Sequence, residues 1–153
     1  MHNNEFVLSV ELVSRLIKSQ CPQWSALPLE LLSEQGTAHV LFQLGKQYVV
    51  RLPRIPGLNS TLKKEYTWVP RLAHAIKTQV SFSEPIFLGT STTYYPSVWM
   101  VSLWQEGSTP TFENEQEYDL LAQDMAKFLN ELHQVDLAKG PKSRRGVPLH
   151  RMD

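Results

Sequence analysis

The spacing of apolar residues changes within the first third of the chain, and this change constrains the fold more than any other feature. Residues 8–19 carry apolar side chains at the three- and four-residue spacing of an amphipathic helix, which Pro22 ends. The spacing then becomes the partial alternation of strands, in three short runs separated by Gly36 and by Gly45-Lys46. These runs cover residues 29–33, 40–44 and 48–52. We therefore expect one helix and then three antiparallel strands joined by tight turns.

A second helical segment follows these strands, after Pro53 and Pro56. Its core-facing stripe comprises Leu62, Glu65, Val69, Leu72, Ala73 and Ile76. Asn59 or Ser60 is the expected N-cap. Pro70 interrupts the stripe, so we expect a kink or two abutting helices there.

Two more strands and a long helix complete the chain. The strands are expected at residues 85–88 and 98–104, and a break follows at residues 107–110. Residues 114–134 then have the broad apolar stripe of an amphipathic helix. The order predicts an α+β fold: a five-stranded antiparallel sheet with one helix inserted after the third strand, and a linker into a helical segment.

Composition excludes several classes of protein. Fifteen lysines and arginines balance fifteen aspartates and glutamates among 153 residues, which argues against a nucleic-acid binder. One cysteine, Cys21, rules out an intrachain disulfide and a multi-cysteine metal site. No apolar stretch approaches the roughly 20 residues that span a bilayer, and residues 1–7 lack a secretory signal. We expect no membrane partner and a cytoplasmic location.

Four groups of residues, in chain order, carry a resemblance to a known family. They are Leu31-Leu32-Ser33-Glu34-Gln35-Gly36-Thr37 with residues 40–45, Val49-Val50-Arg51-Leu52-Pro53-Arg54, Lys64-Glu65 with residues 68–73, and Trp104-Gln105-Glu106-Gly107. Each motif alone is weak, but the collinear set resembles the aminoglycoside phosphotransferase family over nearly the whole chain. The resemblance implies the N-terminal lobe of a protein-kinase-like fold, a hinge and the first helix of the C-terminal lobe.

The resemblance also implies a division of the chain. Residues 1–27 would form an N-terminal helical segment, and residues 28–105 the nucleotide-binding lobe. Residues 106–113 would be the hinge, and residues 114–153 the start of a helical C-terminal lobe.

An ATP site needs three features from such a lobe. The first is a turn whose backbone N–H groups reach the phosphates, for which Ser33, Gly36 and Thr37 are the candidates; an ordinary hairpin turn is the alternative. The second is a cation on the third strand, held by a carboxylate on the inserted helix, for which Arg51 and Glu65 are the candidates.

The Arg51–Glu65 assignment has alternatives. Arg51 lies on the Val49 side of its strand, and a carboxylate on a core-facing stripe needs a partner. Many kinases have lysine at this position, although arginine can serve through its planar donors. A purely structural ion pair remains open, as does a phosphate contact by Arg54. His39, where relatives often have asparagine, could alter a turn contact and gives no reason to expect a metal.

The third feature is a hinge whose backbone binds adenine. Leu103, Trp104 and Gln105 end the last strand, where we expect backbone groups free for a ligand. The aromatic side chains nearby could wall a base, although plain core is the commoner role.

The catalytic residues of the family lie in its C-terminal lobe, and these 153 residues contain no His-Gly-Asp or Asp-Phe-Gly motif. We therefore expect no catalytic residue and no metal ligand here. The expected function is the nucleotide-binding part of an ATP- or GTP-dependent small-molecule phosphotransferase, using Mg²⁺ and inactive as this chain. The family includes antibiotic kinases and kinases of sugars, choline-like alcohols and amino acids. The alternatives are a free-standing binding module without catalysis and an unrelated α+β interaction domain.

The apolar stripe of residues 114–134 would be exposed and could mediate self-association.

Overall fold

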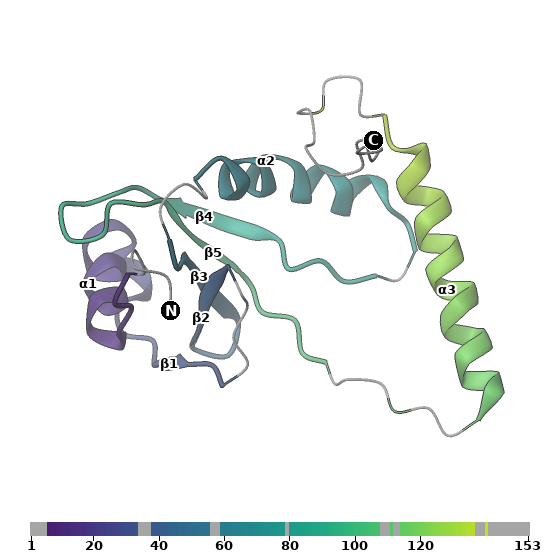
Figure 1. Cartoon of the computed structure of the whole chain (residues 1–153), viewed down its shortest axis with the longest axis horizontal. Coiled ribbons are helices and arrows are strands. Elements are labelled where there is room, and N and C mark those ends of the chain that lie inside the picture. Colours follow the sequence, from purple (N-terminus) through teal and green to yellow (C-terminus); the bar gives the residue numbers. More distant parts are fainter. Residues whose placement is uncertain are drawn as a thin grey trace, which may run out of the picture.

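The computed structural model describes residues 6–33, 38–55, 59–78, 80–107, 111, 114–136 and 140 (Figure 1). The elements are α1 (Val10–Gln20), a short 3-10 helix η1 (Pro22–Trp24), β1 (Leu29–Leu31), β2 (His39–Leu44), β3 (Tyr48–Pro53), α2 (Asn59–Ala75), β4 (Pro85–Gly89), β5 (Trp99–Leu103) and α3 (Glu115–Gln134). Each predicted helix and strand is present. β1 is two residues shorter than expected, and β5 ends one residue earlier.

The strands form one antiparallel sheet in the order β1-β2-β3-β5-β4, which confirms the predicted α+β fold with a helix inserted after the third strand. Gly45 has a φ of 59° in the turn between β2 and β3, a conformation that glycine adopts without strain. This turn pairs Leu41 with Arg51. On the other side of β3, Arg51 faces Met100 of β5.

Helix α1 covers one face of the sheet. Its N-cap is Ser9, whose Oγ accepts a hydrogen bond from the backbone N–H of Leu12. The buried side chains of α1 recur at helical spacing because they meet the apolar face of the strands. The core on this side contains Val13, Leu16, Ile17, Phe42, Leu44, Val50, Leu52, Trp99 and Val101. The alternate residues of β3 must therefore point to the opposite face.

Helix α2 lies on that opposite face, and Figure 1 shows α1 and α2 on the two sides of the sheet. Leu62 is fully buried there, in one cluster with Met100. Asn59 is one of the expected N-caps; its Oδ1 accepts from Ser97 Oγ and from the N–H of Val98, so it ties the start of α2 to the segment just before β5.

The expectation of two abutting helices at Pro70 is wrong, because α2 is one uninterrupted helix from Asn59 to Ala75. Proline has a φ close to the helical value, and it removes a single donor from the helix. Pro70 is only partly buried, so solvent can reach the turn that loses this hydrogen bond.

Helix α3 stands beyond the far end of α2, away from the sheet (Figure 1). Asn114 caps its start by accepting from the N–H of Glu117. Contacts of Glu131 and Phe128 join α3 to the loop after α2. Glu131 Oε2 accepts from the N–H groups of Lys77 (2.6 Å) and Thr78 (2.8 Å), and the ring of Phe128 lies 6.3 Å from that of Phe82.

No side chain of α3 is buried, so the expected exposed apolar stripe is confirmed. Its exposed members are Tyr118, Leu121, Met125 and Leu129. Within the described residues, no helix combines the length and the apolar character that crossing a membrane requires.

Candidate functional site

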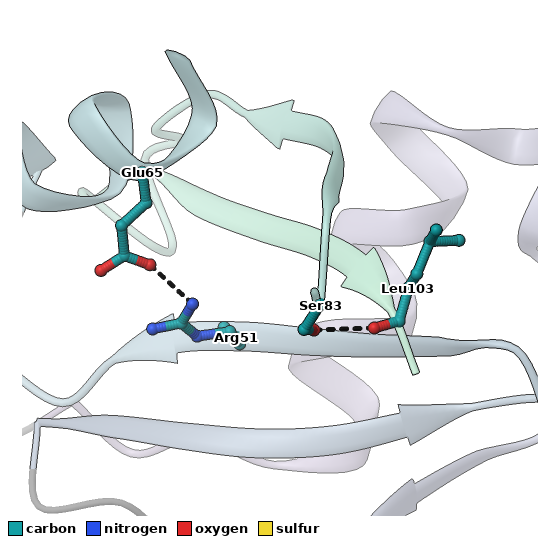
Figure 2. Close-up of polar contacts among 4 residues, drawn as sticks. All are labelled: Arg51, Glu65, Ser83 and Leu103. Atoms are coloured by element: carbon teal, nitrogen blue, oxygen red, sulfur yellow. Dashed lines mark hydrogen bonds and ion pairs between the residues drawn. The ribbon is translucent and has the colours of Figure 1, made fainter. Parts of the chain in front are cut away.

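An ion pair between Arg51 and Glu65 lies on the face of the sheet that α2 covers. The Nη1 of Arg51 donates to Glu65 Oε2 at 2.6 Å. The arrangement follows from the strand: Val50 and Leu52 point into the α1 core, so Arg51 must point toward α2. Figure 2 shows Glu65 reaching down from α2 to the guanidinium. The prediction that these side chains meet on one side of the sheet is confirmed.

The pair orients Arg51 and leaves it with unused donors. Only 26% of the Arg51 side chain and 30% of the Glu65 side chain are exposed, so solvent screens the contact only partly. A guanidinium has five N–H donors, and within the described part of the chain only Glu65 accepts from one. An oriented guanidinium with spare planar donors suits the oxygens of a phosphate.

His39 belongs to the same cluster, which the sequence reasoning missed. Its Nε2 is buried and has no hydrogen-bond partner among the described residues. Burial lowers the pKa of His39 below its ordinary value of 6.5; the positive charge of Arg51 lowers it further, and Glu65 partly offsets this. The signal was present in the alternation, because His39 and Arg51 lie on the same face of the β2–β3 hairpin.

Two backbone N–H groups at the end of β5 are already used, so the expectation that they are free for a ligand is wrong. The N–H of Leu103 donates to the carbonyl of Glu84, and that of Trp104 to the carbonyl of Gln47, both at 2.8 Å. The carbonyl of Leu103 accepts from Ser83 Oγ at 2.7 Å (Figure 2). The segments just before β4 and β3, the two neighbours of β5, therefore already form hydrogen bonds with these backbone groups.

The next backbone groups along the chain remain available. The carbonyl of Trp104 and the N–H of Gln105 have no hydrogen-bond partner among the residues that the structure describes. The side chain of Gln105 donates to the carbonyl of Phe82 at 3.0 Å, which holds this segment against the loop before β4. A donor and an acceptor on adjacent residues can bind the edge of a planar base.

Val49 and Ser102 lie between Arg51 and this segment. They face each other across β3 and β5, on the side of the sheet that carries Arg51. Both are buried, and Ser102 Oγ has no partner among the described residues. On this face of the sheet, Arg51 is followed by the small buried side chain of Ser102. The free backbone groups of Trp104 and Gln105 come next.

The remaining predicted site residues belong to the turn before β2. Ser33 is exposed two residues after the end of β1, and Gly36 and Thr37 lie outside the described residues. No three His, Cys, Asp or Glu side chains within the described ranges are placed to hold a metal ion. Two cavities of about 430 Å³ each flank the junction of α2 and α3, and neither is lined by Arg51 or by the end of β5.

Comparison with known proteins shows the fold and the family of the chain. Among solved structures, the chain is similar to a mutant of aminoglycoside 2′-phosphotransferase-IIIa in complex with GDP, with a TM-score of 0.73 and 21% identity over 85% of this chain and 43% of that one. It is similar to APH(2″)-IIa in complex with gentamicin, with a TM-score of 0.66 and 23% identity over 94% of this chain and 46% of that one. It is also similar to ADP-bound APH(2″)-Ib, with a TM-score of 0.56 and 26% identity over 86% of this chain and 42% of that one.

The chain thus spans less than half the length of these structures, and it shares their kinase-like fold over that part. No curated protein sequence matches it. The sequence profile of the phosphotransferase enzyme family matches residues 30–151, which is most of the chain and includes the Arg51–Glu65 pair and the end of β5. The chain belongs to the phosphotransferase enzyme family, that of the aminoglycoside phosphotransferases.

Proposed function

We propose that this chain binds ATP or GTP as the nucleotide-binding part of a small-molecule phosphotransferase. The observation that carries the proposal is the Arg51–Glu65 pair, which presents an oriented cation on the face of the sheet that also leads to free backbone groups. The similar structures include complexes with GDP, ADP and ATP, which supports a nucleotide as the ligand.

In the proposed complex, Arg51 binds phosphate oxygens and the segment after β5 binds the base. Arg51 faces Met100, three residues before Leu103, and three residues of strand extend about 10 Å. This length is of the order of the distance from the base to the phosphates in an extended nucleotide. The base would bind the carbonyl of Trp104 and the N–H of Gln105, with the backbone of Leu103 behind them.

The turn before β2 would cover the phosphates. We propose that Ser33, Gly36 and Thr37 bring backbone N–H groups to them, since consecutive N–H groups in a turn form an anion-binding concavity. Residues 28–105 would act as the nucleotide-binding lobe, after an N-terminal segment at residues 1–27. Residues 106–113 would be the hinge, and residues 114–153 would begin a helical lobe.

Phosphoryl transfer depends on positioning and on charge stabilisation by Mg²⁺ that bridges the phosphates. We propose that residues 1–153 by themselves bind the nucleotide without transferring phosphate, because they contain neither the aspartate base nor the metal ligands that the family resemblance implies. The acceptor of the complete enzyme would be a hydroxyl group of an aminoglycoside or a similar metabolite in the cytoplasm, in keeping with the gentamicin, kanamycin and streptomycin of the similar structures.

Isothermal titration of the chain with Mg–ADP and Mg–GDP tests the proposal. We expect measurable affinity for at least one of them, and a loss of tenfold or more in Arg51→Gln. Arg15→Gln is the matched control, because Arg15 lies over the ring of Tyr94, on the α1 side of the sheet, and its loss should leave the affinity unchanged. Absence of binding, or equal affinities of Arg51→Gln and the native chain, would refute the proposal.

The uncovered stripe of α3 favours a second function, association with another protein. Large exposed apolar patches mark interaction surfaces, and Leu121 (43% exposed) and Met125 (47% exposed) lie at the centre of this stripe. We propose that two copies of the chain associate through it. Sedimentation velocity should show a dimer that Leu121→Gln with Met125→Gln dissociates. Leu120→Gln is the control, because Leu120 is even more exposed (60%) but lies on the other side of the helix. A monomeric native chain would contradict self-association.

A further inference from the structure

His39 is a histidine beside the proposed phosphate site, and its buried ring nitrogen Nε2 has no hydrogen-bond partner among the residues that the structure describes. We propose that nucleotide binding is linked to proton uptake at His39, so that phosphates held by Arg51 convert this histidine from its neutral to its charged form. The inference rests on the proposed nucleotide-binding function and adds a dependence on pH to it.

The geometry places His39 close to Arg51 and Glu65, the same charged side chains that bound phosphates would meet. In the β2–β3 register, His39 faces Pro53 and Leu41 faces Arg51, so His39 and Arg51 are diagonal neighbours on one face of the hairpin. Both side chains are turned to the side that α2 covers, where Glu65 pairs with Arg51. A negative charge bound at Arg51 therefore interacts electrostatically with His39 across a partly buried space.

Two charged groups of the described chain act on His39, and they oppose each other. Arg51 of β3 repels the protonated imidazole, and Glu65 of α2 attracts it. Burial is the largest cause of the lowered pKa of His39, the repulsion from Arg51 comes second, and Glu65, which is already engaged by Arg51, offsets them only in part. His39 is therefore neutral at neutral pH while the site holds no ligand.

Bound phosphates would counteract the repulsion between Arg51 and the protonated imidazole, which is the larger of these two charge effects. Their negative charges would offset the repulsion from Arg51 and attract the imidazolium directly, so the pKa of His39 would rise in the complex. A group whose pKa is higher in the complex than in the free protein takes up a proton on binding. The gain in affinity is complete below the pKa of the free protein and is lost as the pH rises through the pKa of the complex. Each pKa unit of difference corresponds to a tenfold change in affinity.

The direct measurement is a pH titration of the His39 Cε1–H resonance by NMR, without nucleotide and with saturating Mg–ADP. His39→Asn identifies the resonance by its loss, and His39→Gln serves if the first variant does not fold. We expect the midpoint to move to higher pH on binding. The resonance of His74, which is exposed in the last turn of α2, provides the internal reference.

Calorimetry gives an independent readout. Titration of Mg–ADP at neutral pH in two buffers of different ionisation enthalpy should show uptake of a fraction of a proton in the native chain, beyond that in His39→Asn. The His74→Asn variant should behave as the native chain. The comparison of variants cancels the proton equilibria of the nucleotide itself.

The outcomes separate the two proposals. Nucleotide binding with an unshifted His39 midpoint and equal proton uptake in His39→Asn would overturn the linkage and leave the binding function intact. Absence of any nucleotide binding would overturn both. A midpoint that rises with Mg–ADP, together with proton uptake that His39→Asn removes, would support the linkage.

Discussion

Replacing Glu65 with leucine and Arg51 with methionine, singly and together, measures how strongly this pair organises the site. Each single substitution leaves one charge without its partner on a face that α2 largely covers. The double substitution removes both charges and keeps side chains of similar volume. The difference between the sum of the single effects and the double effect gives the coupling energy of the pair.

The magnitude follows from the burial of the two side chains. Exposed pairs contribute about 0.2–1 kcal/mol, and losing one partner of a fully buried pair costs about 3–5 kcal/mol. With exposed fractions of 26% and 30%, Arg51 and Glu65 lie between these limits. We therefore expect each single substitution to lower the free energy of unfolding by about 2 kcal/mol, with a coupling of about 1–2 kcal/mol. The double substitution should then cost about 2–3 kcal/mol, which is less than the sum of the two single effects by the coupling energy.

Urea unfolding, followed both by far-UV circular dichroism and by tryptophan fluorescence, gives these free energies when the two transitions coincide. For a chain of this length, 2 kcal/mol corresponds to a shift in Tm of about 4–8 °C. The Asp124–Lys127 pair of α3 is the matched control. Its side chains are 72% and 64% exposed, so its coupling should stay below about 0.5 kcal/mol.

A coupling for Arg51 and Glu65 no larger than that of the control pair would refute the reasoning. It would mean that solvent screens the contact as fully as on an open surface. Arg51 would then have no fixed orientation, and the case for a preformed phosphate site would lose its physical basis.

Three further outcomes are expected. Gly89→Ala should cost about 3 kcal/mol in urea unfolding, because a Cβ there would lie 2.1 Å from the ring of the fully buried Trp99; Gly107→Ala, with open space around it, should have little effect, and similar losses would contradict this packing. Burial raises the pKa of the Cys21 thiol to about 11, so a disulfide reagent at pH 8 should label Cys21 only in urea, and rapid labelling of the native chain would argue against its burial. The hydrogen bonds that Glu131 accepts from two backbone amides lower the pKa of its carboxyl below 4.5, and this contribution to stability is present above the unfolded pKa and lost as the pH falls through the folded one. In NMR spectra, the resonances of those two amides should therefore titrate below pH 4.5, and Glu131→Gln should abolish the titration.

The sequence alone determined the order of the elements and the relative directions of Arg51 and Glu65. Strand alternation requires Arg51 to point away from Val50 and Leu52, and helical spacing puts Glu65 on the core-facing stripe. These are local rules, and they need no knowledge of distant segments. They also predicted the apolar stripe of α3, because its period is visible within the helix itself.

Only the tertiary structure decided which groups of the site are free and which are occupied. The N–H groups of Leu103 and Trp104 bind Glu84 and Gln47, which are distant in sequence, so no local pattern could show that they are taken. The place of His39 beside Arg51 depends on the register of the hairpin, and its altered pKa depends on how deeply the fold buries it. Local periodicity fixes the direction of a side chain relative to its own backbone, whereas burial and hydrogen-bond partners depend on what the rest of the chain brings to it.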